Sequence, residues 1–192
     1  MDAGLAAVLG ATVGAVGTGG AGIVAALLAR AQGRSQLSAE YARFIRDQRK
    51  AAYAAYTEAT LKERERLNTA STHLQMAAHA EGDDRAQEIE AARREYRAVQ
   101  EEWGVVERRY AEVAVAGPPA ITLAAVQVSG ALNAYENGVL ECLQTLAGGQ
   151  SCPPGDLARL GEMHRASYDA YLAFLSRASE VLGADGIRRL PE

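Results

Sequence analysis

The sequence predicts an all-α protein with an N-terminal transmembrane helix, followed by an antiparallel, coiled-coil-like bundle of about four long helices. Three observations lead to this prediction. The chain of 192 residues begins with a long uncharged stretch, and about a fifth of its residues are alanine, which favours helices. Apolar residues also recur in three segments at alternating steps of three and four. No segment shows the strict apolar–polar alternation of a strand.

The first element is the predicted transmembrane helix, residues 3–29, which contain no charged residue. Because a helix needs about 20 residues to cross the apolar core of a bilayer, this segment is long enough to span a membrane. Three alternatives are a cleaved signal peptide, a buried helix or hairpin of a soluble core, and a nucleotide-binding loop at Gly17–Gly22. The first lacks a positive N-terminal region and a clean cleavage site, and the third lacks the strands that such a loop joins.

The flanking charges predict how this segment is oriented. Lysine and arginine cluster after it, whereas only Asp2 precedes it, so the positive-inside rule places the N-terminus outside and the rest of the chain in the cytoplasm. Small residues at four-residue steps form a stripe on one face of the helix, and such a stripe lets two helix backbones approach closely. This stripe is expected to pack spans of a homo-oligomer and consists of Gly10, Gly14, Thr18 and Gly22.

A basic juxtamembrane segment follows at residues 30–50. It carries a net charge of +4, whereas residues 51–192 carry −7. On a helix Arg43, Arg46, Arg49 and Lys50 fall on one side. The opposite side is centred on Tyr41, Phe44, Ile45, Ala52 and Tyr56. The basic side is expected either to attract anionic lipid headgroups or to be a solvated face that only fixes the topology. The residues assigned to this role are Arg30, Arg34, Arg43, Arg46, Arg49 and Lys50.

The helical bundle is expected within residues 36–192, and in the predicted topology it is cytoplasmic. Glycine-containing turns divide it, and their shortness makes successive helices antiparallel. Asp83 or Asp84 is expected to cap the second helix and Asp156 the fourth, because a carboxylate accepts hydrogen bonds from the free N–H groups at a helix start. The predicted helices are about 36–80, 84–115, 119–147 and 156–182.

Within the last three helices the apolar residues keep the heptad spacing of a coiled coil, and each stripe is expected to face the core. Alanines in these stripes bring helices close, and Trp103 and the tyrosines supply bulk. The first helix keeps the rhythm with Leu67, Ala70, Leu74 and Ala77. The three stripes are Ile89, Ala92, Tyr96, Val99, Trp103, Val106, Tyr110 and Val113; Ile121, Ala125, Val128, Leu132, Tyr135, Val139, Cys142 and Leu146; and Leu157, Gly161, His164, Tyr168, Tyr171, Leu175, Ala178 and Leu182.

The sequence offers no catalytic, cofactor-binding or metal-binding pattern. A di-iron bundle needs Glu-x-x-His pairs, and none occurs. His164 is interpreted as a hydrogen-bonded core histidine, Cys142 as a small buried hydrophobe and Cys152 as part of an exposed loop. Both thiols are expected to be reduced in a cytoplasmic domain, whereas a Cys142–Cys152 bridge becomes possible if the orientation is inverted. We therefore expect no enzyme, no cofactor and no metal.

A resemblance rests on two short motifs, Arg34-Ser35-Gln36-Leu37 and Arg49-Lys50-Ala51-Ala52-Tyr53-Ala54-Ala55-Tyr56. With the Gly/Ala-rich segment before them, these motifs make the chain similar to a diffuse set of small actinobacterial proteins. In that set a single span precedes a basic R-x-x-A-Y-x-x-F/Y helix and a helical domain. The similarity covers about the first sixty residues, and Tyr56 stands where Phe is commoner. The resemblance implies this architecture and no catalytic residue.

Together these features predict a membrane-anchored interaction or scaffold protein without catalytic activity, located in the cell membrane. Its expected partners are the membrane, further copies of the chain and another protein. The net charge of −4 argues against a general nucleic-acid binder, which needs a basic surface. Two alternatives stay open. One is a membrane-active effector whose small-residue spans assemble into a pore that the bundle regulates, and the other is a soluble helical bundle that binds a small ligand.

Overall fold

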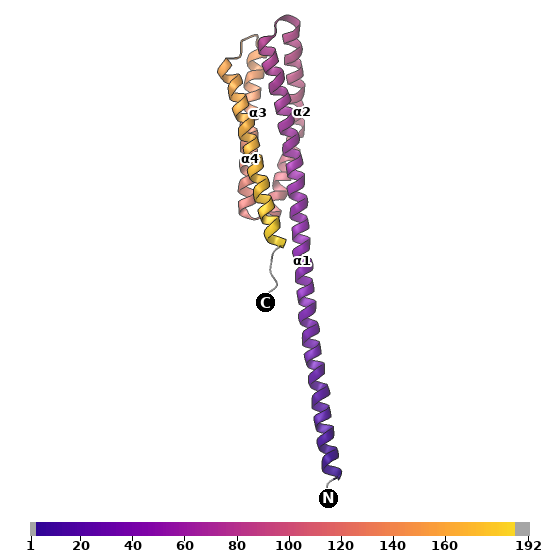
Figure 1. The fold of residues 1–192 in the computed structure, drawn as a ribbon. Coiled ribbons are helices and arrows are strands. Elements are labelled where there is room, and N and C mark those ends of the chain that lie inside the picture. Colours follow the sequence, from indigo (N-terminus) through magenta and orange to yellow (C-terminus); the bar gives the residue numbers. More distant parts are fainter. Residues whose placement is uncertain (1–2, 187–192) are drawn as a thin grey trace. The chain divides into compact units, whose positions relative to one another are not determined.

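The computed structural model describes the backbone of residues 3–186 and the side chains of residues 30–183, apart from residues 31 and 35. The chain divides into two units, residues 1–45 and residues 46–192. The prediction of an all-α chain with four long helices in an antiparallel bundle is confirmed (Figure 1). The helices are α1 (Ala3–His79), α2 (Gly82–Ala116), α3 (Pro119–Ala147) and α4 (Pro154–Gly186).

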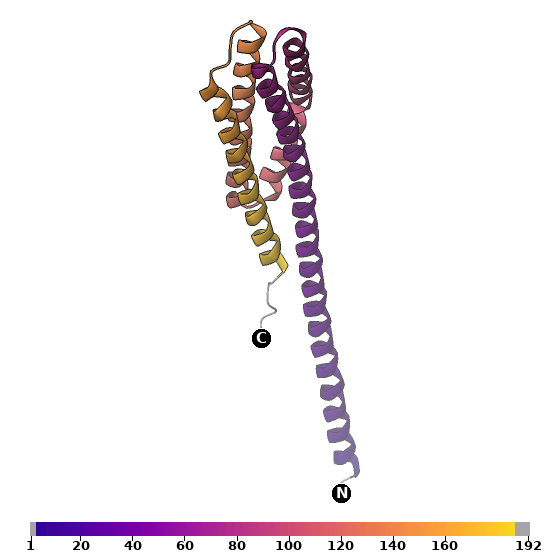
Figure 2. The same ribbon diagram turned by 45° about the horizontal axis from the view of Figure 1, so that its top comes forward.

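In the second unit the helices lie side by side and alternate in direction (Figures 1 and 2). The α1–α2 and α3–α4 connections lie at one end of the bundle, where the Arg85 guanidinium donates a hydrogen bond to the Gln150 carbonyl oxygen at 2.6 Å. The α2–α3 turn lies at the other end. There Arg49 Nε donates a hydrogen bond to the Ala116 carbonyl oxygen at 2.9 Å. Each end of the bundle therefore has a hydrogen bond between an arginine side chain and a backbone carbonyl that is distant in the sequence.

The stripes predicted for α2 and α3 face the core. All eight stripe residues of α3 are buried, with exposed fractions of 4% or less. Of the α2 stripe, five residues are buried and three are half-buried, Ile89, Trp103 and Tyr110. Where α3 packs against α4, the residue on α3 is a glycine, Gly138. A Cβ added at Gly138 would lie 2.7 Å from Met163 Sδ, too close for ordinary contact.

Part of the stripe predicted for α4 is wrong, because three of its predicted positions are replaced in the core by the residues before them. Tyr168 is 43% exposed, whereas Leu160, Ser167 and Phe174 are buried at 1% or less. Each of these buried residues directly precedes a predicted one, so this side of the seam is shifted by one residue. The observed seam passes through Leu160, His164, Ser167, Tyr171, Phe174 and Ala178.

The aromatic residues explain this rotation of α4. The Phe174 ring packs edge-on against the rings of Tyr53 and Tyr56, with centroids 6.1 and 5.1 Å apart. Such pairs stabilise a core beyond their buried area. Tyr168 instead lies under the Arg64 guanidinium, 4.5 Å from its ring centroid, in a cation–π contact. Periodicity alone does not separate the two arrangements, because apolar residues occupy both sets of positions.

The part of α1 within the bundle, residues 46–79, forms the fourth wall. Its predicted stripe is confirmed, since Leu67, Ala70, Leu74 and Ala77 are 0% exposed. The same register continues upstream through buried polar positions. Tyr56 Oη donates a hydrogen bond to the Ala125 carbonyl oxygen at 2.8 Å, and Tyr135 Oη donates one to the Leu67 carbonyl oxygen at 3.3 Å. We call the eight buried residues of this register the α1 seam: Tyr53, Tyr56, Thr60, Glu63, Leu67, Ala70, Leu74 and Ala77.

The helix starts differ from the predicted ones. The α2 helix begins at Gly82, so Asp83 and Asp84 lie within its first turn, and the extended residue before it is Glu81. The α4 helix begins at Pro154, and Asp156 lies in its first turn. The predicted capping roles of these aspartates are therefore wrong. Their carboxylates still favour the helices, because negative charge in the first turn interacts well with the helix dipole.

The predicted transmembrane helix, residues 3–29, lies outside the residues whose side chains the structure describes. The same holds for its packing residues, Gly10, Gly14, Thr18 and Gly22. Within the described part of the chain, no helix combines the length and the apolar character that a membrane crossing requires. The span, its orientation and its pairing therefore stay predictions from the sequence.

Candidate functional site

The basic segment, residues 30–50, is helical, and most of its described side chains are exposed. Five of the six basic residues assigned to lipid headgroups are exposed: Arg30, Arg34, Arg43, Arg46 and Lys50. The sixth, Arg49, is half-buried and donates its Nε hydrogen to the Ala116 carbonyl oxygen at the end of α2. Its guanidinium is therefore partly engaged within the bundle.

Large apolar side chains of the same segment are exposed as well. Leu37, Tyr41 and Phe44 expose 67%, 68% and 63% of their surface. Steps of four and three place the three on one face of the helix. Exposed apolar side chains that lie together mark a contact surface more often than isolated ones do. We call Leu37, Tyr41 and Phe44 the exposed apolar row.

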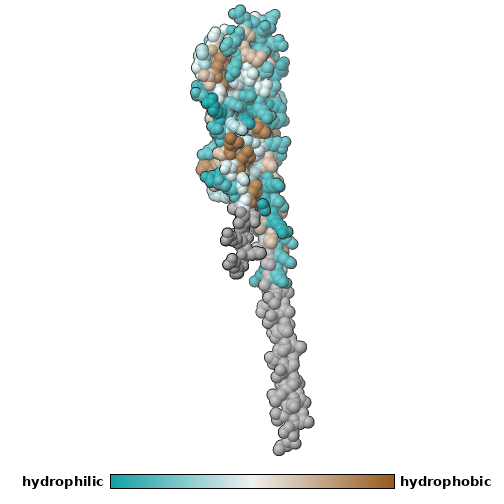
Figure 3. Space-filling model, viewed as in Figure 1, coloured by the Kyte–Doolittle hydropathy of each residue, from teal (hydrophilic) through white to brown (hydrophobic). Residues whose placement is uncertain are grey.

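The bundle has a mixed surface, and one acidic residue lies in its interior. On the face drawn in Figure 3 the surface is mostly hydrophilic, with small apolar patches. Glu63, on the α1 seam, is only 4% exposed, and neither of its carboxyl oxygens has a hydrogen-bond partner. A buried charge without a partner is costly, so its surroundings favour the protonated form. Burial and, less strongly, Glu136 on α3 raise the pKa of Glu63 to about 7.

A cleft of about 370 Å³ opens beside Glu63, and residues of α1, α2 and α3 line it. Its wall is largely apolar, with Trp103, Val106 and Tyr110 from α2 and Leu132 from α3. At its exposed rim, Trp103 Nε1 donates a hydrogen bond to Glu107 Oε1 at 3.0 Å. An apolar cleft of this size with a few polar groups is the usual form of a small-molecule site. We call it the Glu63 cleft.

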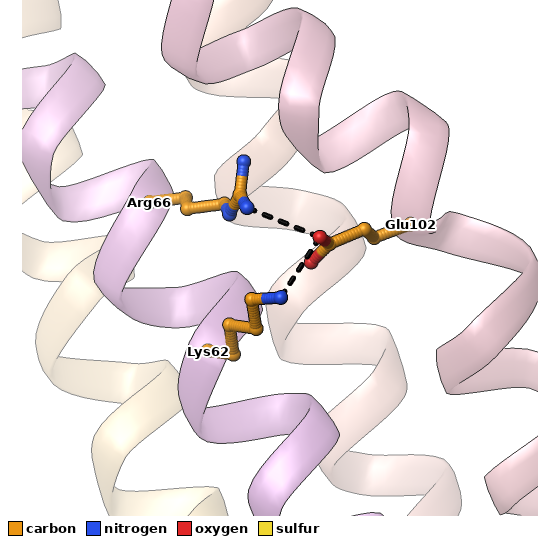
Figure 4. A network of polar contacts seen from close by, with 3 residues as sticks. All are labelled: Lys62, Arg66 and Glu102. Carbon is orange, nitrogen blue, oxygen red and sulfur yellow. Dashed lines mark hydrogen bonds and ion pairs between the residues drawn. The ribbon is translucent and has the colours of Figure 1, made fainter.

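A polar network joins α1 and α2 next to Glu63 (Figure 4). Glu102 Oε1 accepts hydrogen bonds from Lys62 Nζ at 2.9 Å and from an Arg66 Nη at 3.0 Å. The hydrogen bond from Lys62 is the main reason that the pKa of Glu102 is lowered. A smaller cleft of about 260 Å³ is lined by Glu63 together with Lys62 and Glu102. The network therefore holds two basic side chains of α1 on Glu102 and away from the Glu63 carboxyl.

The histidine predicted in the core lies on the α4 seam. The His164 ring is half-buried and packs edge-on against the Tyr135 ring, with centroids 5.7 Å apart. Its Nδ1 is buried and has no hydrogen-bond partner, so the bond expected for a core histidine is missing at that atom. Burial lowers the pKa of His164 and favours the neutral ring.

The two cysteines lie together. Cys142 is 4% exposed, as predicted, but the prediction that Cys152 is exposed is wrong, since it is 7% exposed. The α3–α4 connection places Cys152 Sγ 3.4 Å from Cys142 Sγ, and both are free thiols. Burial raises the pKa of the Cys142 thiol, which keeps it protonated and slow to react.

Glu63 is not among the residues predicted from the sequence, although its position in the heptad pattern is a signal. Steps of four and then three back from Leu67 reach Glu63 and Thr60. A search for apolar residues finds neither, because both side chains are polar. Among the residues with described side chains, no group of three or more histidine, cysteine, aspartate or glutamate residues could hold a metal ion. No protein-family model, curated protein or solved structure matches the chain.

Proposed function

We propose that this protein is a membrane-anchored interaction module without catalytic activity. In this proposal residues 3–29 cross the cell membrane with the N-terminus outside. The bundle lies in the cytoplasm, where it holds a partner protein close to the membrane. Copies of the chain associate through the small-residue stripe of the span, Gly10, Gly14, Thr18 and Gly22.

The observation that carries this proposal is the exposure of apolar and basic side chains on one short stretch. The exposed apolar row lies among Arg34, Arg43 and Arg46, which are also exposed. Aromatic side chains and arginines both favour the boundary between lipid and water, because each combines an apolar body with a polar end. Each basic residue near an anionic surface contributes about 1 kcal/mol of binding. This stretch therefore fits a membrane surface better than open solvent.

The anchor is tested by fractionating cells that express the full-length chain. We expect the protein to stay in the membrane pellet after washing with high salt and with alkaline carbonate, because a spanning helix is held by apolar contacts. A peripheral control protein should be released by the same washes. Release of the full-length chain by carbonate would contradict the anchor.

The orientation is tested with a single reactive cysteine in the bundle. Because both native cysteines are buried, labelling needs a new one, and Ser179 on α4 is exposed. We expect S179C, with Cys142 and Cys152 changed to serine, to resist an impermeant maleimide in intact cells and to react after permeabilisation. Reaction in intact cells would place the bundle outside and overturn the topology.

Self-association is tested by cross-linking the chain in native membranes. Gly14→Leu inserts a bulky side chain into the small-residue stripe and should reduce the cross-linked dimer, because close approach of backbones depends on small residues. Gly20→Leu, the same substitution on the side of the helix opposite the stripe, is the matched control. Equal cross-linking of both variants and the native chain would count against pairing through this stripe.

A further inference from the structure

The Glu63 cleft carries acidic groups without a compensating basic group. Glu63 and Glu107 are carboxylic acids, and none of the residues that line the cleft is lysine, arginine or histidine. Glu136, the α3 carboxyl that acts on Glu63, adds further negative potential. An anionic ligand would be repelled by these carboxyls, and a wholly apolar one would leave the Glu63 oxygens without a partner.

The basic side chains nearest along α1 and α2 are engaged elsewhere. Lys62 and Arg66 both contact Glu102, and Arg109 pairs with Glu112 at 2.8 Å. On α1 the neighbouring Arg64 guanidinium lies over the rings of Tyr168 and Tyr171, 4.5 and 5.1 Å from their centroids. None of these four basic side chains therefore pairs with Glu63, whose two carboxyl oxygens have no hydrogen-bond partner.

The rest of the cleft suits the body of an organic cation. Trp103 and Tyr110 present aromatic surface, and aromatic faces attract cations as well as apolar groups. Val106 and Leu132 supply aliphatic contact, whereas Ser129 and Asn133 offer hydrogen-bonding groups. A volume of about 370 Å³ accommodates a molecule of one ring with a short side chain.

We propose that the Glu63 cleft binds a small organic ammonium ion, whose charged nitrogen pairs with the Glu63 carboxylate and whose apolar body lies against Trp103, Val106 and Leu132. This site is independent of the membrane anchor, since its residues belong to the bundle. Binding supplies the hydrogen-bond donors that the two Glu63 oxygens lack. A hydrogen bond between charged groups in a partly dry site is stronger than one between neutral groups.

The test uses the purified full-length chain and its only tryptophan, Trp103, which lines the cleft. The probes are phenethylamine, phenethyl alcohol and phenylacetate, which resemble each other in size and differ in charge. Titration should change the Trp103 fluorescence, and the amine should bind about ten- to a hundredfold more tightly than the alcohol. Phenylacetate should bind most weakly. Equal affinities for amine and alcohol, or no response at millimolar concentrations, would overturn the proposal.

Two variants locate the site. Glu63→Gln keeps the size of the side chain and should abolish the preference for the amine, whereas Glu180→Gln removes an exposed carboxyl on α4 and should keep it. Gly130→Leu should fill the cleft and weaken all three probes, because nothing lies within 4 Å of a Cβ added there. Thermal melting checks that each variant is folded. An amine preference that survives in Glu63→Gln, or binding unchanged in Gly130→Leu, would contradict the assignment.

Discussion

Two stretches of α1 carry apolar residues at the same spacing, yet they differ completely in burial. The exposed apolar row at residues 37–44 shows 63–68% of its surface, whereas the α1 seam at residues 53–77 shows 4% or less. The second stretch is covered by α2, α3 and α4, which follow it in the chain. An amphipathic pattern therefore predicts that a helix packs against a neighbour, but it does not specify which neighbour. Other helices of the bundle cover the α1 seam, whereas no described residue gives the exposed apolar row a comparable cover.

The largest difference between the two stretches is expected when one tyrosine is removed from each. Tyr56 is 0% exposed and its hydroxyl donates a buried hydrogen bond, so Tyr56→Ala should lower the free energy of unfolding by about 3–5 kcal/mol. Tyr41 is 68% exposed, and Tyr41→Ala should change it by about 0.5 kcal/mol or less. Urea unfolding of the full-length chain measures both. Similar losses would show that the row is part of a packed core.

A second test concerns the acidic residue of the α1 seam. The pKa of Glu63 rises from 4.5 to about 7 in the folded protein, so the folded state holds this proton more tightly than the unfolded state. Its stabilising contribution is complete below pH 4.5 and is lost as the pH rises through about 7, in total about 3 kcal/mol.

Glu63→Gln removes this titration. Between about pH 4 and pH 8 the native chain should therefore lose roughly 3 kcal/mol of unfolding free energy relative to the variant. Unfolding curves at several pH values measure the difference. Glu58→Gln, at an exposed position of the same helix, controls for the change in net charge. Parallel pH profiles of the native chain and Glu63→Gln would show that Glu63 titrates normally.

A third test stabilises the bundle with a disulfide and leaves the exposed stretch at residues 37–44 unchanged. Oxidised glutathione can take two electrons from Cys142 and Cys152, whose two thiols lose their protons as an S–S bond forms. The bond closes a loop of about ten residues, which should stabilise the bundle by about 2–3 kcal/mol. Trypsin cleavage at Arg43 should keep its rate, whereas cleavage within the bundle should slow. Cys142→Ser should abolish the effect, and a faster bundle cleavage after oxidation would contradict it.

The smallest effects are expected at the exposed stretch itself. In a synthetic peptide of residues 30–50, Arg43→Gln should weaken binding to anionic vesicles by about 1 kcal/mol, roughly fivefold. Asp47→Asn should strengthen it, since it removes a negative charge from the same surface. Flotation with vesicles of anionic and of zwitterionic lipid measures both. Equal binding to the two kinds of vesicle would remove the electrostatic part of the proposal.

Much of the bundle could be predicted from the sequence because the heptad spacing is unbroken. In α3 the stripe from Ile121 to Leu146 is the one continuous apolar line, and every member is buried. In α4 two lines compete, since Phe174 and Leu175 are adjacent and both apolar. The packing of the Phe174 ring against Tyr53 and Tyr56 favours the line through Phe174 as the one that faces inward. Periodicity therefore predicts a core helix well and its rotation less well.

The candidate site was harder to predict, because its central residue breaks the pattern that reveals the core. Glu63 occupies a seam position, but hydrophobic periodicity does not detect a buried carboxyl. The pairing of Cys142 with Cys152 depends on how the α3–α4 connection folds back, and loop paths are poorly encoded by local sequence. The sequence predicts Tyr41 and Phe44 on one apolar face together with Ala52 and Tyr56, but only the structure separates the exposed pair from the buried pair.

Gly138 marks a place where α3 approaches α4 closely enough that a further carbon would clash with Met163. The α3 helix also packs against α2, so it has neighbours on both sides and a fully buried stripe. Its backbone amides should therefore exchange hydrogen for deuterium only when the whole bundle opens, whereas the ends of α2 and α4 exchange by local fraying. Among the described helices we therefore expect the slowest-exchanging amides in the middle of α3, although α1 is the longest helix.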